Sequence, residues 1–476
     1  MSSEQIATAT GASVLLAGEK DVCGDVVIDS RKVERGCVFV AFVGERVDGN
    51  AYLDAAIEAG AACVVASAEV GEATLAAAAA AGCAVLRAAG DDCEEFMLRL
   101  AHAWRAAHPE WLVVGVTGSV GKTTTKDMLR AGLSASSRVH ATPANLNNLI
   151  GLPITILSAP VDAEVLVCEL GMNHFHEIER LAAACEPAMA VITNVGTSHV
   201  GLLGSRENIA RAKAEVVGGL KAHGEIGPIL ALTSANDFTS FIADEFARPA
   251  GVPVDLVGGA ADDAVSCGDI TIDADGMPCF TARCADGWSR EVRLNVPGKK
   301  AVDDFLLALD VIWRCGFDRD AAVAAIEGME MTGMRLEVGT SPSGVRVIDD
   351  SYNAAPNSMA SSMDVLCEMA CVGRRIAVLG EIGELGAEER RLHGYVGAYA
   401  AGKPIDMLVL IGGELAREMG EAARTMGMSE DAIQMFSSVE EAAATMVDVF
   451  ESGDLVLVKA SRSAELDCFA QEVLAK

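Results

Sequence analysis

The sequence contains few basic residues, and this shortage excludes one class of partner. There are 37 lysines and arginines against 68 aspartates and glutamates, which gives a formal net charge of −31 over 476 residues. A protein that binds DNA or RNA needs basic patches that neutralise phosphates, so we expect no nucleic-acid partner. We interpret the acidic excess as a source of solubility.

Long apolar runs, a signal peptide and paired cysteines are also missing. No run of about 18 strongly apolar residues appears, which predicts no association with a membrane. The first residues, Met-Ser-Ser-Glu-Gln, lack the basic and apolar regions of a signal peptide. The 14 cysteines are scattered without a C-x-x-C pair, and Cys367 and Cys371 have no nearby histidine or cysteine to complete a zinc site. These absences predict a cytoplasmic protein with free thiols.

A glycine-rich segment at residues 115–126 is the most informative part of the chain. It reads Gly-Val-Thr-Gly-Ser-Val-Gly-Lys-Thr-Thr-Thr-Lys, follows the apolar run 111–114 and precedes a helix-like stretch at 127–133. This order predicts a strand, a tight turn and the start of a helix. Gly118 and Gly121 permit the backbone angles with which successive N–H groups surround a phosphate.

Two side chains of this segment have the chemistry that nucleotide binding requires. Lys122 can reach the β- and γ-phosphates, and the Thr123 hydroxyl can bind Mg²⁺. The usual loop reads G-x-x-x-x-G-K-[ST], and Val116 replaces its first glycine. We predict a phosphate-binding loop; the alternative is a tight turn with an exposed lysine. The predicted nucleotide-binding residues of the loop are Gly118, Ser119, Val120, Gly121, Lys122, Thr123 and Thr124.

Short apolar strands alternate with helix-like segments throughout, which predicts an α/β protein with largely parallel sheets. We expect three domains, at residues 1–108, 109–334 and 335–476, in keeping with about 150 residues per domain. The first is a small α/β domain, the second has a P-loop-type, mostly parallel sheet flanked by helices, and the third is a Rossmann-like parallel-sheet domain. An alternating pattern within 255–297 predicts an antiparallel insert.

Polar residues follow several predicted parallel strands, namely Glu169, Asn194, Asp349, Asp350 and Lys459. Ligands of open α/β sheets bind at the carboxyl ends of the strands. Two such sheets that face one another predict a cleft between the second and third domains.

Most of these residues also have a purely structural interpretation. Glu169 suits Mg²⁺, which needs one or two protein carboxylates, but a charged residue can also simply end a strand. A lone loop histidine such as His199 is more often a solvated surface residue. Ser205 is a candidate N-cap, and the spacing that follows favours Lys213 as an exposed helical lysine.

The third domain offers similar alternatives. Arg335 provides a planar cation for phosphates. Asp349 and Asp350 can contact a nucleotide, bind a metal or form a plain turn. The turn at Ser461 and Arg462 can hold an anion, although a cap for the last helix is slightly favoured.

Taken together, these motifs resemble the Mur ligases, the ATP-dependent amide-forming enzymes of peptidoglycan precursor synthesis. The resemblance covers nearly the whole chain. It rests on residues 117–126, 145–153 and 169–173, and on Asn194, His199, Lys213, Arg335 and Asp350.

Within the family, two stretches resemble the members that add D-alanyl-D-alanine, at residues 349–359 and 380–386. The arginine-containing signature of the members that add the third residue is not found. Residues 29–31 and 44–49 resemble the uridine-nucleotide-binding part that both groups share.

The resemblance implies roles for these residues. Lys122 and the loop amides hold ATP, Thr123 and Glu169 bind one Mg²⁺, and His199 with a carbamylated Lys213 binds or supports a second. Carbamylation makes the lysine an anionic oxygen ligand. This implied role disagrees with the interpretation of Lys213 as an exposed helical lysine, which its spacing favours. Arg335 and Asp350 reach ATP from the third domain. Implied substrate contacts are Ser30, Arg31, Asn148, Asn353, Lys459, Ser461 and Arg462.

The implied reaction joins UDP-N-acetylmuramoyl-tripeptide to D-alanyl-D-alanine. The peptide carboxylate attacks the γ-phosphoryl group of ATP, and the dipeptide amine then attacks the acyl phosphate. Two cations and Lys122 offset the converging negative charge, while domain closure excludes water. We expect a monomer with small-molecule substrates; the third residue of the peptide stays open.

The chain departs from the family around the adenine. The usual G-x-H-N-x-x-N stretch reads Gly298-Lys-Lys-Ala-Val-Asp-Asp304, so that Lys300, Ala301 and Asp304 replace its histidine and asparagines. An asparagine side chain donates and accepts hydrogen bonds, and alanine does neither. We predict altered adenine recognition with intact phosphoryl chemistry.

Two alternatives to an active ligase of this type remain. One is a ligase with another substrate, such as a folylpolyglutamate synthase, which should lack residues 1–108. The other is a non-catalytic nucleotide-binding homologue, which Lys300 and Ala301 favour. Residues of the matching type count against it, namely Lys122, Glu169, His199 and Lys213.

Overall fold

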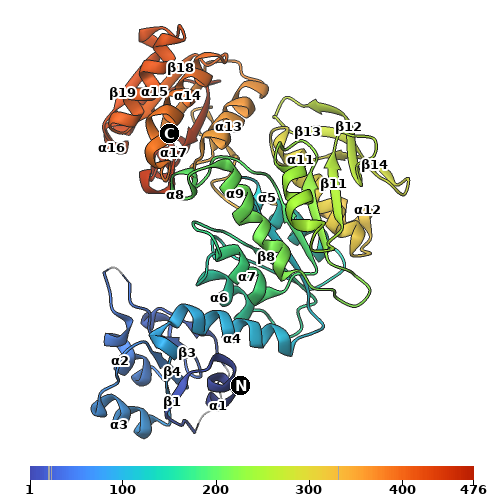
Figure 1. The fold of residues 1–476 in the computed structure, drawn as a ribbon. Helices are drawn as coiled ribbons and strands as arrows, with labels where there is room; N and C mark the ends of the chain where they lie inside the picture. Colours follow the sequence, from blue (N-terminus) through green and yellow to red (C-terminus); the bar gives the residue numbers. More distant parts are fainter. Residues whose placement is uncertain (20–21, 23, 45, 331) are drawn as a thin grey trace.

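The computed structural model describes residues 1–19, 22, 24–44, 46–330 and 332–476. Three sheets, of five, nine and six strands, form the centres of three bodies that follow one another along the chain. Figure 1 shows the amino-terminal body at one end, next to the central body, with the carboxy-terminal body on the far side of the central one. This is the three-domain α/β fold that the sequence predicts.

The amino-terminal body is a small sheet covered by helices. Its elements are α1 (Ser3–Thr10), β1 (Ser13–Leu16), β2 (Val26–Val27), β3 (Val38–Val40), α2 (Leu53–Glu58), β4 (Cys63–Ala66), α3 (Glu72–Ala81), β5 (Ala84–Arg87) and α4 (Cys93–Ala107). The strand order is β1-β5-β4-β3-β2, and all pairs except β1–β5 are parallel. The buried run of β4 explains its central place, since a parallel strand is covered on both faces.

The central body contains the long sheet. Its elements are β6 (Leu112–Thr117), α5 (Lys122–Ser134), β7 (Val139–Ala141), α6 (Gly151–Leu157), β8 (Val165–Glu169), α7 (Glu177–Cys185), β9 (Met189–Ile192), α8 (Val200–Leu203), α9 (Arg206–Ala214), β10 (Ile229–Thr233), α10 (Thr239–Ile242), β11 (Val254–Gly258), β12 (Val265–Ile272), β13 (Pro278–Cys284), β14 (Ser289–Arg293), α11 (Lys300–Arg314) and α12 (Arg319–Glu327). The order is β14-β13-β12-β11-β10-β9-β6-β8-β7.

The predicted antiparallel insert is present as β12, β13 and β14, which pair antiparallel with one another. Strand β11, at the start of the predicted insert, instead continues the parallel part of the sheet through β10. Helices α5, α11 and α12 pack on one face through side chains such as Leu129 and Phe305. Helices α6, α7 and α9 cover the other face.

The carboxy-terminal body is a parallel sheet with one antiparallel edge. Its elements are β15 (Glu337–Thr340), β16 (Arg346–Asp349), α13 (Pro356–Glu368), β17 (Arg375–Gly380), η6 (Gly386–Glu388), α14 (Glu389–Ala401), β18 (Met407–Ile411), α15 (Glu414–Thr425), β19 (Ile433–Phe436), α16 (Val439–Met446), β20 (Leu455–Lys459), η9 (Arg462–Ala464) and α17 (Asp467–Ala475). The order is β15-β16-β20-β17-β18-β19, with β15 antiparallel to β16.

The central and carboxy-terminal bodies touch closely where α8 meets η6. The Gly201 N–H donates to the carbonyl of Glu384 at 3.2 Å. A Cβ at Gly201 would lie 2.6 Å from the carbonyl carbon of Leu385, so this approach requires glycine. On another side, Lys299 forms an ion pair of 3.0 Å with Glu368 at the end of α13.

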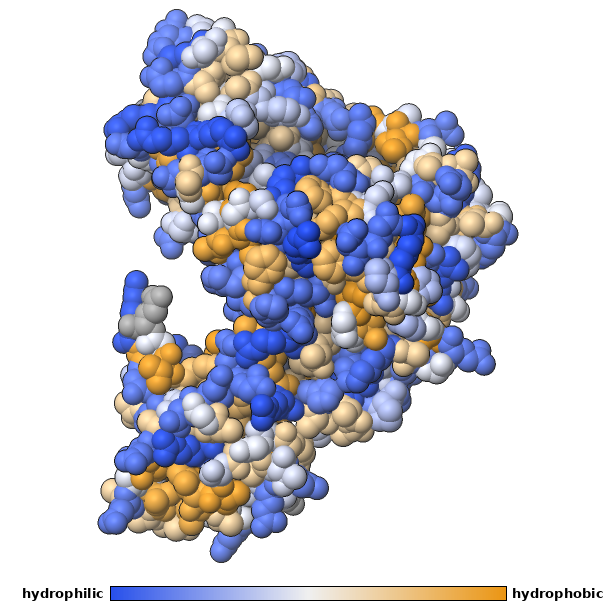
Figure 2. Space-filling view, in the orientation of Figure 1, coloured by the Kyte–Doolittle hydropathy of each residue, from blue (hydrophilic) through white to orange (hydrophobic). Residues whose placement is uncertain are grey.

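Helix α4 joins the amino-terminal body to the central one. Arg180 of α7 forms ion pairs with Glu94 and Glu95 of α4, at 2.6 Å and 3.2 Å. Figure 2 shows the surface hollowed between the amino-terminal body and the rest of the molecule. Among the helices that the structure describes, none has both the length and the apolar character needed to cross a bilayer.

Candidate functional site

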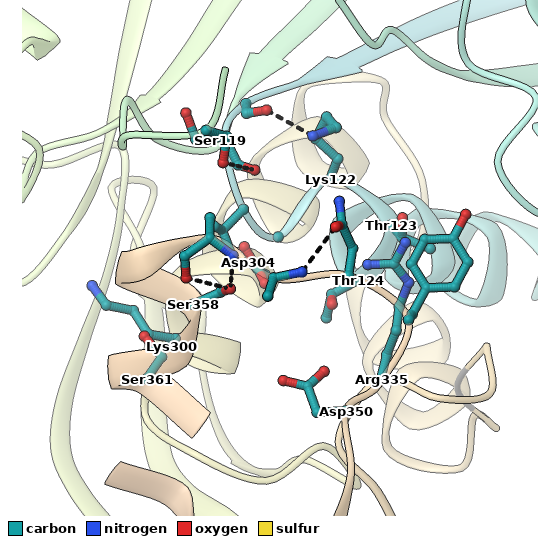
Figure 3. A pocket seen from close by; sticks show the side chains of 18 of the residues that line it. Ser119, Lys122, Thr123, Thr124, Lys300, Asp304, Arg335, Asp350, Ser358 and Ser361 are labelled. Atoms are coloured by element: carbon teal, nitrogen blue, oxygen red, sulfur yellow. Dashed lines mark hydrogen bonds between the residues drawn. The ribbon is translucent and has the colours of Figure 1, made fainter. Parts of the chain in front are cut away.

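A cavity of about 610 Å³ lies between the central and carboxy-terminal bodies, where the carboxyl ends of their strands meet. It contains most of the residues that the sequence singled out. Those that line it are Gly118, Ser119, Val120, Gly121, Lys122, Thr123, Thr124, Asn148, Glu169, His199, Lys213, Lys300, Asp304, Arg335, Asp350, Asn353 and Lys459. Figure 3 shows several of them converging on one space.

The glycine-rich loop connects β6 to α5, in the predicted order of strand, turn and helix. Gly121 precedes the helix with φ +88°, a left-handed conformation that favours glycine. A Cβ at Gly118 would collide with the Thr193 side chain. The loop therefore lies close to the neighbouring strand end, with the amino-terminal end of α5 at the cavity, where an anion is favoured.

Asn194 supports this loop rather than lining the cavity. Its side-chain oxygen accepts the Val120 N–H at 3.1 Å, and its amide donates to the Val120 carbonyl at 2.8 Å. The Thr193 hydroxyl donates to the same carbonyl at 2.5 Å. The asparagine thus fixes the loop by two backbone bonds.

Thr123 and Glu169 form a buried pair of oxygen groups at the start of α5. The Thr123 hydroxyl donates to Glu169 Oε2 at 2.9 Å, and both residues are at most 2% exposed. The other carboxylate oxygen accepts a hydrogen bond of 2.8 Å from Asn147. A hydroxyl and a carboxylate beside a phosphate-binding loop are ligands that suit Mg²⁺. Asn147 was not singled out from the sequence, although it lies in the recognised stretch 145–153.

Lys213 is buried, so the interpretation of an exposed helical lysine is wrong. It is 2% exposed on α9, and its Nζ has no hydrogen-bond or ion-pair partner in the part of the chain that the structure describes. Burial, together with the nearby Lys122 cation, holds the pKa of Lys213 well below its ordinary value. The predicted N-cap is confirmed, since Ser205 accepts the Asn208 N–H at 3.1 Å and so begins α9.

Lys122 points back along the loop. Its Nζ donates to the Gly118 carbonyl at 2.8 Å. Burial lowers the pKa of Lys122, while the Glu169 carboxylate acts against that shift. The ammonium is therefore held at the phosphate end of the cavity with hydrogen-bonding capacity to spare.

His199 is paired with the other body and is not a solvated loop residue. Its Nδ1 lies 2.6 Å from Glu384 Oε2, and the imidazole is 21% exposed. The contact with His199 lowers the pKa of Glu384. Glu384 was not predicted as a site residue, because the contact joins segments far apart in the sequence.

The two consecutive aspartates of the third domain have different environments. Asp349 accepts hydrogen bonds from the backbone and hydroxyl of Ser351, at 3.0 Å and 2.6 Å, and so forms a turn. Asp350 lines the cavity, where Lys459 and the Ser362 hydroxyl both contact its Oδ2 at 2.5 Å. The sequence left a nucleotide contact, a metal site and a plain turn open for this pair, and Asp349 forms the turn.

Arg335 offers unused donors to the cavity. Its guanidinium stacks 4.1 Å above the centre of the Tyr352 ring, and its buried Nε has no hydrogen-bond partner among the described residues. A guanidinium without a carboxylate partner retains its planar set of donors for phosphate.

The residues that depart from the family pattern lie at the start of α11, where Asp304 adjoins Gly121 of the loop. The Lys300 side chain is 74% exposed and pairs with Asp303 at 3.2 Å. Ala301 and Asp304 are buried at the start of α11. Burial raises the pKa of Asp304 well above its ordinary value.

Four predicted substrate residues lie away from this cavity. Ser30 and Arg31 are in a short 3-10 helix of the amino-terminal body, where Arg31 forms an exposed ion pair of 2.8 Å with Asp29. Ser461 donates to the Glu381 carbonyl at 2.8 Å, and Arg462 follows it in η9. The interpretation of Ser461 as cap of the last helix is wrong, because α17 begins only after Leu466. Glu45, in the stretch 44–49, is outside the described residues.

The predicted metal ligands include residue types other than histidine, cysteine, aspartate and glutamate. Among the described residues, no group of three or more histidine, cysteine, aspartate and glutamate side chains is placed to hold an ion. The predicted set consists of a threonine, a glutamate, a histidine and a modified lysine, so this finding does not test it.

Comparisons with known proteins agree on one family. The chain matches the Mur ligase middle domain at residues 116–312, the Mur ligase glutamate ligase domain at 334–462 and the Mur ligase family catalytic domain at 25–97. A UDP-N-acetylmuramoyl-tripeptide--D-alanyl-D-alanine ligase of Bacillus subtilis is 32% identical, with 96% of this chain and 94% of that protein covered. The enzyme of that name from Mycobacterium tuberculosis is also 32% identical, with coverage of 99% and 97%.

Solved structures show the same fold. A crystal structure of MurF from Acinetobacter baumannii matches with a TM-score of 0.88 and 26% identity, over 100% of this chain and 99% of that one. MurF ligase from Thermotoga maritima in complex with ADP matches with a TM-score of 0.79 and 25% identity, over 95% and 98%.

Proposed function

The chain belongs to the Mur ligase family, and from that premise we propose that it joins D-alanyl-D-alanine to UDP-N-acetylmuramoyl-tripeptide with ATP. It is an ATP-dependent ligase of peptidoglycan precursor synthesis. The match to relatives of that name along 96% of the chain carries this conclusion. The phosphate loop and the polar strand ends around one cavity are consistent with it.

ATP occupies the cavity with its phosphates at the loop. The loop amides and Lys122 hold the β- and γ-phosphates, and Asn194 keeps the loop in place through Val120. Arg335 adds a second cation from the carboxy-terminal body, and Asp350 completes the nucleotide contacts. A relative bound to ADP supports the use of this nucleotide.

Two Mg²⁺ ions fit the donor groups present. Thr123 and Glu169 hold the first, since their oxygens are 2.9 Å apart at the loop. His199 and a carbamylated Lys213 hold or support the second; a lysine with a lowered pKa is neutral more often and can then react with CO₂. The ions supply charge stabilisation where the anionic reactants converge.

The two outer bodies hold the two substrates. Residues 1–108 bind the uridine nucleotide through Ser30 and Arg31, with Asn148 at the central body, and the hollow in Figure 2 provides the space. Residues 335–476 hold the incoming dipeptide, with contacts from Asn353, Lys459, Ser461 and Arg462. The enzyme acts in the cytoplasm as a monomer.

The reaction proceeds in two steps. A carboxylate oxygen of the tripeptide bonds to the γ-phosphorus of ATP, and the bond from that phosphorus to the bridging oxygen breaks, which releases ADP. The dipeptide amine then bonds to the carbonyl carbon, the bond to phosphate breaks, and the amine loses a proton. Lys122 and Arg335 stabilise the charge that develops on the transferred group, and closure of the bodies excludes water.

The nucleoside end differs from that of the family. Lys300 points to solvent beside Asp303, and Ala301 has no polar side-chain atom. We therefore expect weaker or less selective adenine binding than in relatives with the usual motif. An ATP affinity equal to theirs would contradict this expectation.

A direct assay tests the function. The protein is incubated with ATP, Mg²⁺, UDP-N-acetylmuramoyl-tripeptide and D-alanyl-D-alanine, and phosphate release is followed together with the mass of the product. We expect pentapeptide product from the wild type and none from a folded Lys122→Ala variant. The assay is repeated with tripeptides that differ in their third residue. ADP binding without product from any of them would favour the non-catalytic homologue or another substrate.

A further inference from the structure

Asp304 occupies an unusual place for a carboxylate, directly against the phosphate-binding loop. It lies near the start of α11, just after the first turn, is 8% exposed and lines the cavity. If Gly121 carried a Cβ, that atom would be 2.8 Å from Asp304 Oδ2, so the loop backbone and the carboxyl group are in contact. Figure 3 shows Asp304 between the loop residues and Ser358 of α13.

The surroundings of Asp304 provide little to stabilise a negative charge. Asp304 forms no ion pair among the described residues, and the nearby Thr125 hydroxyl, which has no hydrogen-bond partner there, only partly offsets the effect of burial on its pKa. Lys300 is directed to Asp303 instead, at 3.2 Å. The nearest neighbour in the chain, Asp303, is itself an acid and repels a second negative charge.

The charged groups on the elements around Asp304 are mostly engaged elsewhere. On α5, Lys126 pairs with Asp127 at 3.2 Å, and Lys122 donates to Gly118. On α13, Asp364 pairs with Lys403 at 2.6 Å and Glu368 with Lys299 at 3.0 Å. Across the cavity, Arg335 stacks on Tyr352 and Asp350 pairs with Lys459.

An ionised carboxylate at this position would work against nucleotide binding. It would accept the same loop N–H groups that a phosphate needs, and it would repel the phosphate itself. A neutral carboxyl group has the opposite effect, because its O–H is a hydrogen-bond donor. Burial already raises the pKa of this group, which favours the neutral form.

We propose that Asp304 binds the nucleotide as a neutral carboxylic acid whose O–H donates to it, so that nucleotide binding is linked to a proton at this residue. This inference rests on the proposed nucleotide site in the cavity. The role is one of binding and selectivity at the loop, and it leaves the transfer chemistry to Lys122, Arg335 and the cations.

Calorimetric titration with ADP and Mg²⁺ tests the link without measuring activity. Affinity is measured from about pH 7 to about pH 9.5 for the wild type, Asp304→Asn and Asp303→Asn, with circular dichroism at each pH to verify folding. Above the pKa of Asp304, wild-type affinity should fall by as much as about tenfold per pH unit. Asp304→Asn keeps a neutral donor and should lose this alkaline decline.

Asp303→Asn is the matched control, one residue away on α11. It should keep the decline, displaced to lower pH, because removing the neighbouring negative charge lowers the pKa of Asp304. At a pH above the pKa of Asp304, where the free carboxyl group is ionised, titrations in two buffers of different ionisation enthalpy should show more proton uptake per ADP in the wild type than in Asp304→Asn. If the asparagine variant does not fold, Asp304→Ser provides the same comparison.

The outcomes separate this inference from the proposed function. The same pH dependence and proton uptake in the wild type and the neutral variant would overturn the role of Asp304 while ADP binding stands. No ADP binding by the folded wild type at any pH would overturn the nucleotide site itself, and this inference with it.

Discussion

His199 and Glu384 connect two bodies of the molecule through a contact of 2.6 Å between Nδ1 and Oε2. Both residues have left-handed backbones, with φ +63° and +64°. Such a conformation costs a residue other than glycine on the order of 1–3 kcal/mol, so the surrounding structure holds both in place. We infer that this contact fixes the position of the proposed metal-supporting histidine when the two bodies are together.

Removing the charge of Glu384 tests that relationship. Glu384→Gln should lower kcat roughly threefold to tenfold, since the partner carboxylate is half exposed and the pair is partly screened. The KM for ATP should change less, because the loop is untouched. Glu388→Gln, which removes a partner of Arg391 on the adjacent η6, is the matched control. Equal effects of the two substitutions on kcat would contradict the assignment.

The glycine contact beside this pair predicts a loss of domain closure. Gly201→Ala places a methyl group 2.6 Å from the carbonyl carbon of Leu385, so the bodies must separate. Activity should fall more than about tenfold with little change in melting temperature, because the clash is at an interface. Gly218→Ala, where a Cβ would meet no atom of the described residues within 4 Å, should leave activity unchanged. Small-angle scattering should show a more extended variant; an unchanged, fully active one would refute the prediction.

The buried lysine predicts a modification. With its pKa held down by burial and by Lys122, the Lys213 amine is neutral over more of the pH range and should take up CO₂. Protein incubated with ¹³C-bicarbonate should show a carbamate NMR signal that Lys213→Gln lacks. Lys126, buried but paired with Asp127, is the comparison, and Lys126→Gln should keep the signal. Absence of a signal in fully active wild-type protein would remove carbamylation from the account.

Asn147 predicts a change in metal dependence. It supplies the hydrogen bond of 2.8 Å to Glu169 Oε1, and its loss leaves a buried carboxylate oxygen less well oriented. Asn147→Ala should raise the Mg²⁺ concentration for half-maximal activity roughly tenfold. The neighbouring Asn145→Ala, whose side chain has no such bond to Glu169, should have a smaller effect. An unchanged Mg²⁺ requirement would contradict the role of Glu169 as a ligand.

Asp310 predicts a stability change with pH. Burial raises its pKa to about 8, and neither oxygen has a hydrogen-bond partner among the described residues. The folded state therefore holds a proton that the unfolded state has lost above its ordinary pKa, so stability falls as pH rises from about 4 towards about 8. The free energy of unfolding, measured with urea, should fall between about pH 6 and about pH 9 in both proteins. The fall in Asp310→Asn should be smaller than that of the wild type by roughly 1–3 kcal/mol. The exposed Asp262→Asn should keep the wild-type slope, and an equal slope in Asp310→Asn would be the contrary result.

Much of the fold could be predicted, because buried parallel strands are continuous apolar runs. Strands β6, β8, β17, β18 and β20 all follow from such runs. Strands such as β1, β7 and β15 are harder to predict, because they have partly exposed side chains and lie at sheet edges. Their pairing depends on neighbours distant in sequence, which a local pattern does not contain.

The site was predictable where its chemistry is local. The loop residues 118–123 carry their function in their spacing, and Glu169 in its place after a strand. The burial of Lys213 and the contact between His199 and Glu384 arise from tertiary packing, so spacing alone gave an exposed lysine and a surface histidine. The family resemblance supplied a metal-supporting role for both residues, but neither the burial of Lys213 nor the contact of His199 with Glu384.

One isotope measurement tests most directly that the cavity is the active site of an acyl-phosphate-forming ligase. Tripeptide substrate labelled with ¹⁸O in its reacting carboxylate is converted with ATP and D-alanyl-D-alanine, and the released phosphate is examined by mass spectrometry. The account predicts one ¹⁸O atom in the phosphate, because the carboxylate oxygen bonds to phosphorus before the amide forms. Amide product accompanied by unlabelled phosphate would contradict it.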